Sequence, residues 1–183
     1  MRAAAVCVFL AAAVWAQEPT PRQRAEGAIN DLGRVLQQLL GEEMKHGGYA
    51  GAVRSCAENA QTVTEEFGRE RQVDIRRVSL KYRNQRDQPD DWEAERLKAW
   101  LKQAEAGAAL APVEETVTEN GRRFLRMMKP IRLQAACLGC HGAREQLAPE
   151  VKAQLEAKYP RDKATGYKTG DLRGAFTVLV RLP

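Results

Sequence analysis

The sequence of 183 residues predicts an α+β domain in which helices come first and mostly antiparallel strands follow. Through residues 21–67, apolar side chains recur at steps of three and four, the period of one helical face. Beyond residue 70, short runs of alternating apolar and polar residues predominate, and Asn120-Gly121 separates two of them. Residues 17–183 number 183 − 16 = 167, a length typical of one domain. We therefore expect one domain over residues 17–183, with helices over about 21–67 and an α+β core over about 70–183.

The first residues of the chain predict export. Arg2 precedes an apolar run from Ala3 to Trp15, which polar residues follow, so we expect a signal peptide over residues 1–16. The run is shorter than the roughly 20 apolar residues that a membrane span needs, and no later stretch approaches that length. The mature chain is therefore expected to be soluble, without a membrane span, and periplasmic or otherwise exported.

Two helices are predicted in the first part of the mature chain. The first extends from Pro21 to about Glu43, and Gly47-Gly48 then interrupts the pattern. The second ends at Gly68 and places Cys56 on its apolar, inward face. The positions that define the two faces are Ile29, Leu32, Leu36 and Leu39 in the first helix, and Tyr49, Val53, Ala60, Val63 and Phe67 in the second.

An extended segment and a third helix are expected next. Residues 73–83 are rich in Val, Ile and Tyr with polar alternation, which is typical of a strand. Asp90 and Glu93 have the spacing of a capping box, which predicts the start of a helix that continues through Ala106.

The last third of the chain predicts a hairpin, a short helix and a final strand. Asn-Gly between residues 113–118 and 122–131 is the strongest short-range hairpin signal. Pro149 opens a helix that ends before Pro160, because proline is favoured in a first helical turn and cannot continue a helix. Residues 172–182, rich in Val and Leu, predict the last strand.

The charge pattern argues against a nucleic-acid partner. The formal net charge is +5, which falls by one to +4 when Arg2 leaves with the signal peptide. Acidic and basic residues are interleaved, and no run of Lys and Arg with interspersed aromatic residues is present. We interpret the charges as a solvated surface.

Cys137-Leu138-Gly139-Cys140-His141 is the motif with the most specific chemistry. In an exported protein, C-x-x-C-H is the attachment signature of haem c, with two thiols for the vinyl groups and an imidazole for the iron. The spacing places both thiols about one turn apart on a forming helix. The sequence therefore predicts one covalent haem c, held through Cys137 and Cys140 with His141 as axial ligand, and a need for the haem c maturation system.

Three other interpretations compete for these residues. A thioredoxin-type redox pair needs a βαβ pattern nearby, which the sequence lacks. Zinc could be held by Cys56, Cys137, Cys140 and His141, although the adjacent Cys140 and His141 would be strained into one tetrahedron. A structural disulfide between Cys137 and Cys140 would leave Cys56 and His141 without roles.

The second axial ligand is open from the residues alone. Cys56 is an odd thiol in an oxidising compartment, and it is either a ligand or a small buried hydrophobe. His46 lies beside Gly47-Gly48 in an expected loop, where a solvated side chain is the simpler interpretation. Met127 and Met128 lie on a hairpin strand where one of them must face the core, so packing explains them. The candidates by element are Cys56, His46, Met44, Met127 and Met128.

Four blocks of the sequence, in this order, resemble the PAS-like periplasmic c-type haem domain family, a family of unknown function. Its members occur as small exported haem proteins and as the sensor half of some membrane receptors. The resemblance covers nearly the whole mature chain. The blocks are Ala52-Val53-Arg54-Ser55-Cys56, Arg77 to Asn84 with Pro89-Asp90-Asp91-Trp92-Glu93, Cys137 to Gly142, and Asp162 to Phe176.

The resemblance implies a central antiparallel sheet with flanking helices and a haem bound covalently against the sheet. It also implies, in some members, an axial pair of the motif histidine and a cysteine from the early helix, which corresponds to His141 and Cys56. Members often carry Tyr-Tyr-Arg-Pro before the haem motif, whereas this chain has Met127-Met128-Lys129-Pro130. The two methionines keep His/Met ligation open.

Four residues near the end of the chain are candidates for contacts with the haem propionates. Lys163, Tyr167, Lys168 and Arg173 lie in or next to a glycine-punctuated loop, which suits a segment that lines a cofactor. Their side chains could make charge-assisted hydrogen bonds to the propionates. Solvated loop charges are the other interpretation.

We expect a mono-haem c-type protein that acts as a redox-responsive haem sensor or a low-potential electron-transfer module, with an unidentified redox or signalling partner protein. A His/Met electron carrier and a zinc-stabilised interaction domain are the alternatives. No constellation of side chains for turnover of a substrate is present, so the protein is not expected to be an enzyme.

Overall fold

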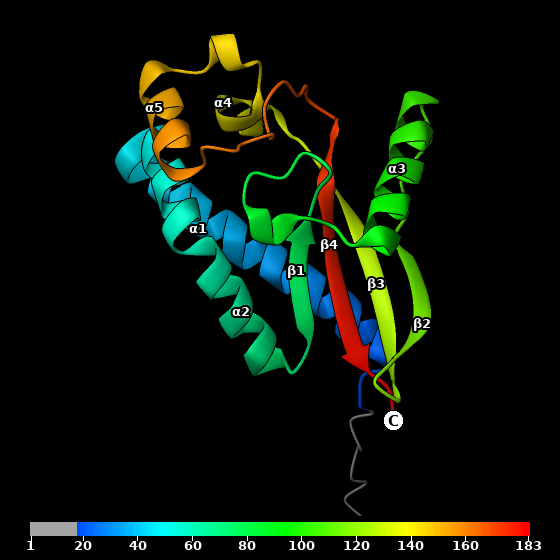
Figure 1. Cartoon of the computed structure of the whole chain (residues 1–183). Helices are drawn as coiled ribbons and strands as arrows, with labels where there is room; N and C mark the ends of the chain where they lie inside the picture. The colour runs from blue at the N-terminus through cyan, green and yellow to red at the C-terminus, as the bar shows by residue number, and fades with distance from the viewer. Residues whose placement is uncertain (1–17) are drawn as a thin grey trace, which may run out of the picture.

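The computed structural model describes residues 18–183, and the predicted signal peptide lies outside them. Four antiparallel strands form one sheet in the order β1-β4-β3-β2, with helices on both faces, which confirms the α+β prediction (Figure 1). No helix in the described range is long and apolar enough to cross a membrane. The elements in chain order are α1 (Pro21–Glu58), α2 (Ala60–Arg71), β1 (Asp74–Val78), η1 (Gln85–Asp87), α3 (Asp91–Glu105), β2 (Val113–Glu119), β3 (Arg122–Arg132), η2 (Ala135–Cys137), α4 (Leu138–His141), η3 (Arg144–Gln146), α5 (Pro149–Lys158) and β4 (Leu172–Arg181).

The long helix α1 bends at Gly48. It begins with a capping box between Thr20 and Gln23, which satisfies backbone donors of the first turn. Gly48 has φ 59° and ψ −159°, while its neighbours stay helical. The interruption predicted at Gly47-Gly48 is therefore a kink inside one helix. His46, expected in a loop, lies on the helix with its side chain exposed.

The second predicted helix is divided by a one-residue break at Asn59, which has φ −115° and ψ −33°. The side-chain amide of Asn59 donates to the Ser55 hydroxyl at 3.3 Å, the kind of local hydrogen bond with which Asn competes against a helical backbone. Beyond the break, α2 packs against β1 through Phe67 and Ile75.

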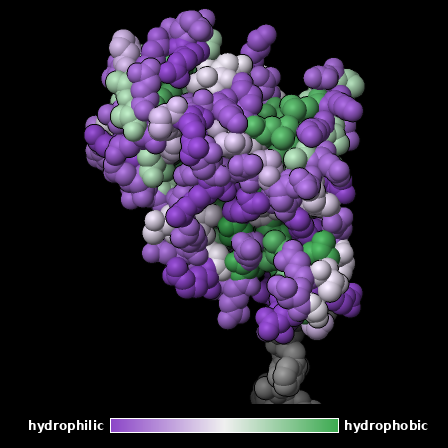
Figure 2. Space-filling view, viewed as in Figure 1, coloured by the Kyte–Doolittle hydropathy of each residue, from purple (hydrophilic) through white to green (hydrophobic). Residues whose placement is uncertain are grey.

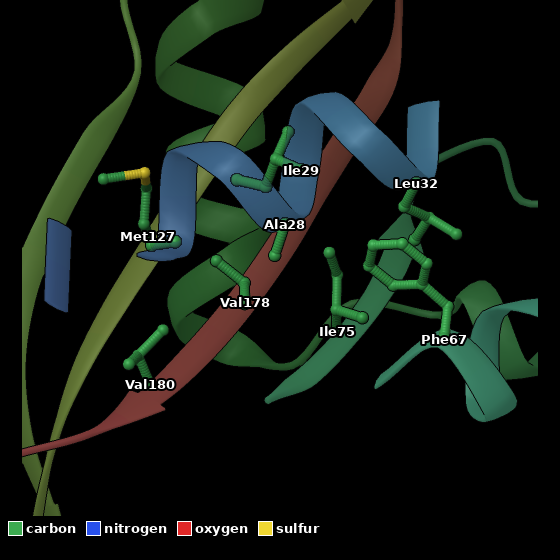
Figure 3. Close-up of a cluster of buried hydrophobic side chains, with 9 residues drawn as sticks. Ala28, Ile29, Leu32, Phe67, Ile75, Met127, Val178 and Val180 are labelled. Atoms are coloured by element: carbon green, nitrogen blue, oxygen red, sulfur yellow. The ribbon is translucent and has the colours of Figure 1, made fainter. Parts of the chain in front are cut away.

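Alternation along the strands gives the sheet two buried faces. Met127 and Met128 are neighbours on β3, and their side chains enter the cores on opposite faces. The core against α1 and α2, shown in Figure 3, contains Ala25, Ala28, Ile29, Leu32, Phe67, Ile75, Met127, Val178 and Val180. The core against α3 contains Val78, Leu97, Trp100, Met128, Leu172 and Ala175.

The local signals in the second half of the sequence are confirmed. Asn120 and Gly121 have φ of 50° and 73°, because the tight turn of a twisted hairpin needs positive φ at both positions. Asp90 and Glu93 form the capping box of α3, and Pro149 lies in the first turn of α5.

The extended segment predicted over residues 73–83 pairs as a strand only to Val78. Beyond it, the Ser79 hydroxyl donates to the Arg173 carbonyl at 2.7 Å, and the Ser79 N–H donates to the Asp87 carbonyl at 3.0 Å. These hydrogen bonds replace the ladder of the sheet. The chain therefore leaves the sheet at Ser79.

The surface carries interleaved charges, as the sequence predicts. Figure 2 shows hydrophilic side chains over most of one face of the molecule, with apolar side chains in smaller groups. Exposed neighbours on the helices form ion pairs, among them Arg34 with Asp31 at 3.0 Å and Lys45 with Glu42 at 2.7 Å. Such pairs each contribute little to stability, because water screens them.

Replacing Gly48 by alanine should destabilise the chain, because its φ and ψ lie in a region nearly exclusive to glycine. We expect a loss of about 1–3 kcal/mol in the free energy of unfolding, measured by urea denaturation. Gly47→Ala is the matched control: an added Cβ meets no atom within 4 Å at either position, but Gly47 is helical. Alanine there should stabilise by about 0.5–1 kcal/mol. Equal effects of the two substitutions would contradict the kink.

Candidate functional site

A cavity of about 520 Å³ lies between the sheet and α1. Residues from β1, β3 and β4 form one side, both segments of the bent helix form another, and residues 134–141 close it. Its size falls within the roughly 300–1,000 Å³ of small-molecule and cofactor sites. Its apolar lining includes Leu36, Leu39, Leu40, Met44, Ala52, Val53, Ile131, Leu133 and Phe176.

The cavity brings together the four side chains that the sequence singles out most strongly. Cys137 ends η2, and Cys140 and His141 lie in the short helix α4. Cys56 comes from α1, about two turns beyond the kink. All three cysteines are free thiols, and all four residues line the same space.

Close packing against α1 explains the glycine inside the motif. A Cβ on Gly139 would lie 2.4 Å from the ring of Tyr49, the first residue after the kink. The motif can approach α1 only because this position has no side chain. The contact holds the motif against the segment of α1 that carries Cys56.

His141 is held as a neutral imidazole with one nitrogen free. Its Nδ1 is 2.7 Å from the carbonyl of Ala164, which can only accept, so Nδ1 carries the proton and donates it. Burial holds the pKa of His141 well below its usual value, and the charges of Arg83 and Arg173 lower it further. The lone pair of Nε2 is therefore available to a metal at neutral pH. A backbone carbonyl on the other nitrogen is the usual support of a metal-bound histidine.

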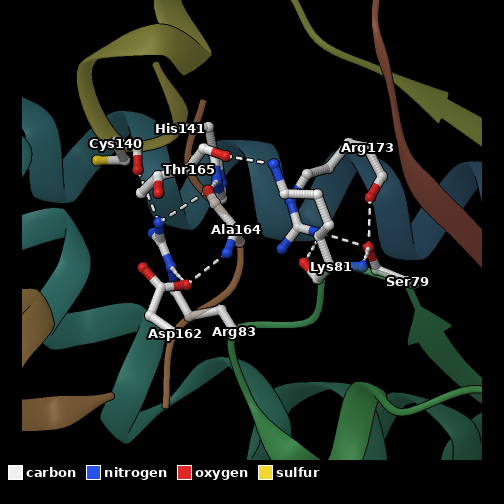
Figure 4. A network of polar contacts seen from close by, with 9 residues as sticks. All are labelled: Ser79, Lys81, Arg83, Cys140, His141, Asp162, Ala164, Thr165 and Arg173. Carbon is white, nitrogen blue, oxygen red and sulfur yellow. Dashed lines mark hydrogen bonds and ion pairs between the residues drawn. The ribbon is translucent and has the colours of Figure 1, made fainter. Parts of the chain in front are cut away.

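Arg83 ties three segments together (Figure 4). Its Nε pairs with Asp162 Oδ1 at 3.1 Å, and one Nη donates to the carbonyls of Cys140 at 2.7 Å and Ala164 at 3.2 Å. The side chains of Arg83 and Asp162 are only 10% and 3% exposed, so this ion pair is buried. Asp162 Oδ1 also accepts from the Ala164 N–H at 2.8 Å. Arg83 thus fixes both the motif helix and the carbonyl that accepts from His141.

The loop over residues 162–171 lies along the motif. The Gly166 N–H donates to the Gly142 carbonyl at 2.8 Å, and the Tyr167 N–H donates to the His141 carbonyl at 3.0 Å. The Tyr167 ring stands edge-on to the His141 ring, with centroids 6.3 Å apart and an interplanar angle of 88°. Backbone and ring together restrict the orientation of the imidazole.

Partial burial disfavours the thiolate form of Cys56 and Cys140. Burial raises the pKa of Cys140 to about 11, although the Arg83 charge opposes the shift. Burial also raises the pKa of Cys56, against the charges of Arg77 and Arg83. The guanidinium groups are therefore the features of the site that favour a thiolate.

The structure brings one of the four residues proposed for propionate contacts to the cavity. Arg173 lines it, whereas Lys163 and Lys168 are exposed and do not. Lys163 Nζ donates instead to the Tyr82 hydroxyl at 3.0 Å. Tyr167 packs beside the cavity with Leu133 and Ala164. Ala164 and Tyr167 are the residues of this loop that turn inward, and the two lysines lie at its exposed positions.

Of the alternative axial ligands, one lines the cavity and three do not. Met127 and Met128 are buried in the two cores of the sheet and do not line the cavity. His46 is exposed on α1 and does not line it. Met44 does line it, from the segment of α1 before the kink, while Cys56 lines it from the segment after.

The zinc interpretation has no geometric support in the described residues. No group of three or more His, Cys, Asp or Glu side chains within 18–183 is arranged to hold a metal ion. Cys56, Cys137, Cys140 and His141 instead surround a space of cofactor size. A structural zinc needs its four ligands in one compact tetrahedron.

Sequence patterns alone miss three residues of the site: Tyr49, Arg77 and Arg83. Arg77 and Ser79 alternate on the strand side that faces the cavity, so period-2 alternation would place them once that face is known. Arg83 lies at the end of the segment predicted as extended, but the strand ends at Val78, so alternation does not predict the direction of the Arg83 side chain. Tyr49 reads as an ordinary apolar position of a helix.

Fold and site define a class of protein: an α+β domain whose sheet and bent first helix enclose a cofactor-sized cavity with three thiols and a neutral imidazole. The chain belongs to the Tll0287-like family, whose model matches residues 10–181. A solved structure described as the cyanobacterial heme-protein Tll0287 is similar, with 24% identity, 86% of this chain and 95% of that chain covered, and a TM-score of 0.61. This likeness shows the fold. Among curated proteins, no relative matches the chain.

Removing Arg83 should destabilise the chain strongly, because Asp162 would be left as an unpaired buried charge. We expect Arg83→Gln to lower the free energy of unfolding by about 3–5 kcal/mol in urea denaturation. Arg86→Gln is the control, since Arg86 pairs with Glu65 at an exposed position and should contribute less than about 1 kcal/mol. Similar losses of stability in both variants would contradict the assignment of Arg83 and Asp162 as a buried ion pair.

Proposed function

We propose that this chain is an exported mono-haem c-type protein that works as a redox-responsive haem sensor or a low-potential electron-transfer module. The observation that carries the proposal is the cavity, which gathers both cysteines of C-x-x-C-H, a neutral His141 and a further thiol, Cys56. Membership in the Tll0287-like family supports it, and so does the heme named for the similar solved structure.

The residues of the cavity fit a haem in three respects. Two thiols at C-x-x-C spacing suit the two vinyl groups, and His141 has a free Nε2 lone pair beside them. Most of the remaining lining is apolar, as a porphyrin face requires. The buried Nε of Arg77 has no hydrogen-bond partner and is available to an anionic group.

Cys137 and Cys140 would each add their S–H across one vinyl double bond. Each addition would form one carbon–sulfur bond and break the S–H bond and the vinyl π bond. The proton would go to the neighbouring vinyl carbon, and no oxidant or reductant would be consumed. Both residues are free thiols, as this addition requires. We propose that the haem c maturation system carries out the attachment in the exported compartment.

His141 and Cys56 are the proposed axial ligands. The Ala164 carbonyl fixes the tautomer of His141 and leaves its Nε2 lone pair free to hold the iron. Arg77 and Arg83 favour the thiolate form of Cys56 against the penalty of burial. A haem bound between them would supply one-electron chemistry at a low potential, because a thiolate donates electron density and stabilises ferric iron.

Met44 supports a second candidate function, an electron carrier with His/Met ligation. It lines the cavity from α1, and a methionine ligand gives a higher potential than a thiolate. Met127 and Met128, the methionines that the sequence suggested for this role, are packed in the cores of the sheet.

The proposal also includes export of the chain and a separate partner protein. The signal peptide is inferred from residues 1–16, and the PAS-like relationship from the sequence blocks around Arg77 and Asp162. An antiparallel sheet with a ligand cavity on one face supports a sensing role. We propose a sensor or carrier that acts through another redox or signalling protein, and not an enzyme.

Expression of the full chain with a haem c maturation system should yield a coloured protein heavier than the processed chain by one haem. Replacing Cys137 and Cys140 together by alanine should abolish covalent haem, because both attachment thiols are lost. Cys56→Ala removes the third thiol of the cavity and should retain the covalent haem. Mass spectrometry and the pyridine haemochrome spectrum measure the attachment. A colourless wild-type protein would contradict the proposed function.

Cys56→Ala should alter the low-spin ferric spectrum and raise the reduction potential, because it removes the thiolate. Met44→Leu keeps the size of its side chain and should leave both properties unchanged. Optical spectra and potentiometry of the two variants separate the two candidate functions. An unaltered ferric spectrum in Cys56→Ala would contradict His141/Cys56 ligation. A changed ferric spectrum in Met44→Leu would favour the electron carrier with His/Met ligation.

A further inference from the structure

Four arginines line the cavity, and among the described residues only Arg83 pairs with a carboxylate. Arg132 is exposed, which leaves Arg77 and Arg173 as the half-buried arginines without such a partner. Arg77 comes from β1 and Arg173 from β4, which are neighbouring strands of the sheet. The Nε of Arg77 is buried, and no hydrogen-bond partner for it exists among the described residues. Arg173 donates to the Ser79 hydroxyl at 2.8 Å and to the Lys81 carbonyl at 3.1 Å, and both acceptors are uncharged.

No carboxylate of the lining forms an ion pair with Arg77 or Arg173, although the charge of Asp87 acts favourably on Arg173 from a distance. Asp87 is the one acidic residue that lines the cavity in the described part of the chain, and its carboxylate accepts from Gln61 at 2.8 Å instead. Burial lowers the pKa of Arg173, and the charges of Arg83 and Arg77 lower it further. The wall thus concentrates positive charge in a place where charge is poorly hydrated.

The neighbouring residue Arg76, on the same strand, provides a comparison, because it has a carboxylate partner within the protein. Alternation sends Arg76 to the opposite face of the sheet, where it pairs with Glu93 at 2.5 Å. Glu93 is 1% exposed and also pairs with Arg126 at 3.0 Å. On that face the buried charges are matched within the protein, whereas on the cavity face they are not.

We infer that Arg77 and Arg173 form a carboxylate-binding subsite, which takes the two propionate groups of the haem. The inference rests on the proposed function for the identity of the acid. A guanidinium matches a carboxylate in shape and charge, and a bound carboxylate would provide the acceptor that Arg77 Nε lacks. Lys163 and Lys168 are exposed on the loop and take no part.

Resonance Raman spectra of the haem-loaded full chain test the subsite, because the propionate bending mode responds to hydrogen bonds at these groups. Arg77→Gln and Arg173→Gln should each move this mode to lower frequency in the molecules that carry haem, because each variant lacks one donor to a propionate. Lys168→Gln removes the same charge from an exposed position and should give the wild-type spectrum. If Arg173→Gln does not fold, Arg173→Lys, which keeps the charge, should still shift the mode.

A wild-type propionate mode in both haem-loaded glutamine variants would overturn the subsite and leave the haem function intact. Stability gives a second, independent test. In the full chain produced without haem, Arg77→Gln should raise the melting temperature, because it removes an unpaired charge and no hydrogen bond of the protein. A lower melting temperature would assign Arg77 a structural role and overturn the inference.

A free dicarboxylate could also supply two carboxylates to Arg77 and Arg173, and succinate is the compound that tests this. Succinate should raise the melting temperature of the haem-free wild-type chain and have no effect on the variant with both arginines replaced by glutamine. If the chain never acquires haem, this result sustains the subsite while the proposed function fails. A wild-type chain without response to succinate and without haem would overturn both.

Discussion

The site depends on one backbone acceptor, the carbonyl of Ala164. It accepts the Nδ1–H of His141 at 2.7 Å and an Nη–H of Arg83 at 3.2 Å. A carbonyl oxygen has two lone pairs, and here both are used. The orientation of the imidazole, the position of Arg83 and the path of the loop over residues 162–171 are therefore determined together. A change in any one of them displaces the other two.

Arg83 acts on the site through position and through charge. As a donor to the Cys140 carbonyl it holds the motif helix, and as a partner of Asp162 it holds the loop. As a buried positive charge it also lowers the pKa of His141 and opposes the rise in the pKa of Cys56. The same guanidinium therefore favours the neutral imidazole and the anionic thiolate, the two forms that bind a metal.

Much of the fold follows from local signals in the sequence, because these signals act over a few residues. The capping box at Asp90, the Asn120-Gly121 turn and the helix opened by Pro149 each depend on backbone groups nearby. The C-x-x-C-H motif is local in the same sense. The kink at Gly48 is less predictable, since a glycine pair reads equally as a loop and as a bend.

The cavity could not be predicted in this way, because it exists only where distant segments meet. Arg83 lies beyond the end of β1, and its three acceptors come from the motif and from the loop after α5. Tyr49, the first residue after the kink, contacts Gly139, which is far away in the sequence. Lys168, which its sequence neighbourhood made a candidate, is exposed and does not line the cavity.

Side chains alternate between the two faces of a strand, and in this sheet the alternation separates residues of the packed cores from residues of the cavity. It sends Met127 and Met128 into two packed cores and leaves Met44, on a helix, as the methionine that reaches the cavity. It also sends Arg76 to a buried glutamate and Arg77 to the cavity. Because unpaired charge that is poorly hydrated lowers stability, a wall that holds Arg77 and Arg173 without a carboxylate carries a cost that a bound anion would offset. The inferred subsite would therefore account for arginines that the fold itself leaves without a charged partner.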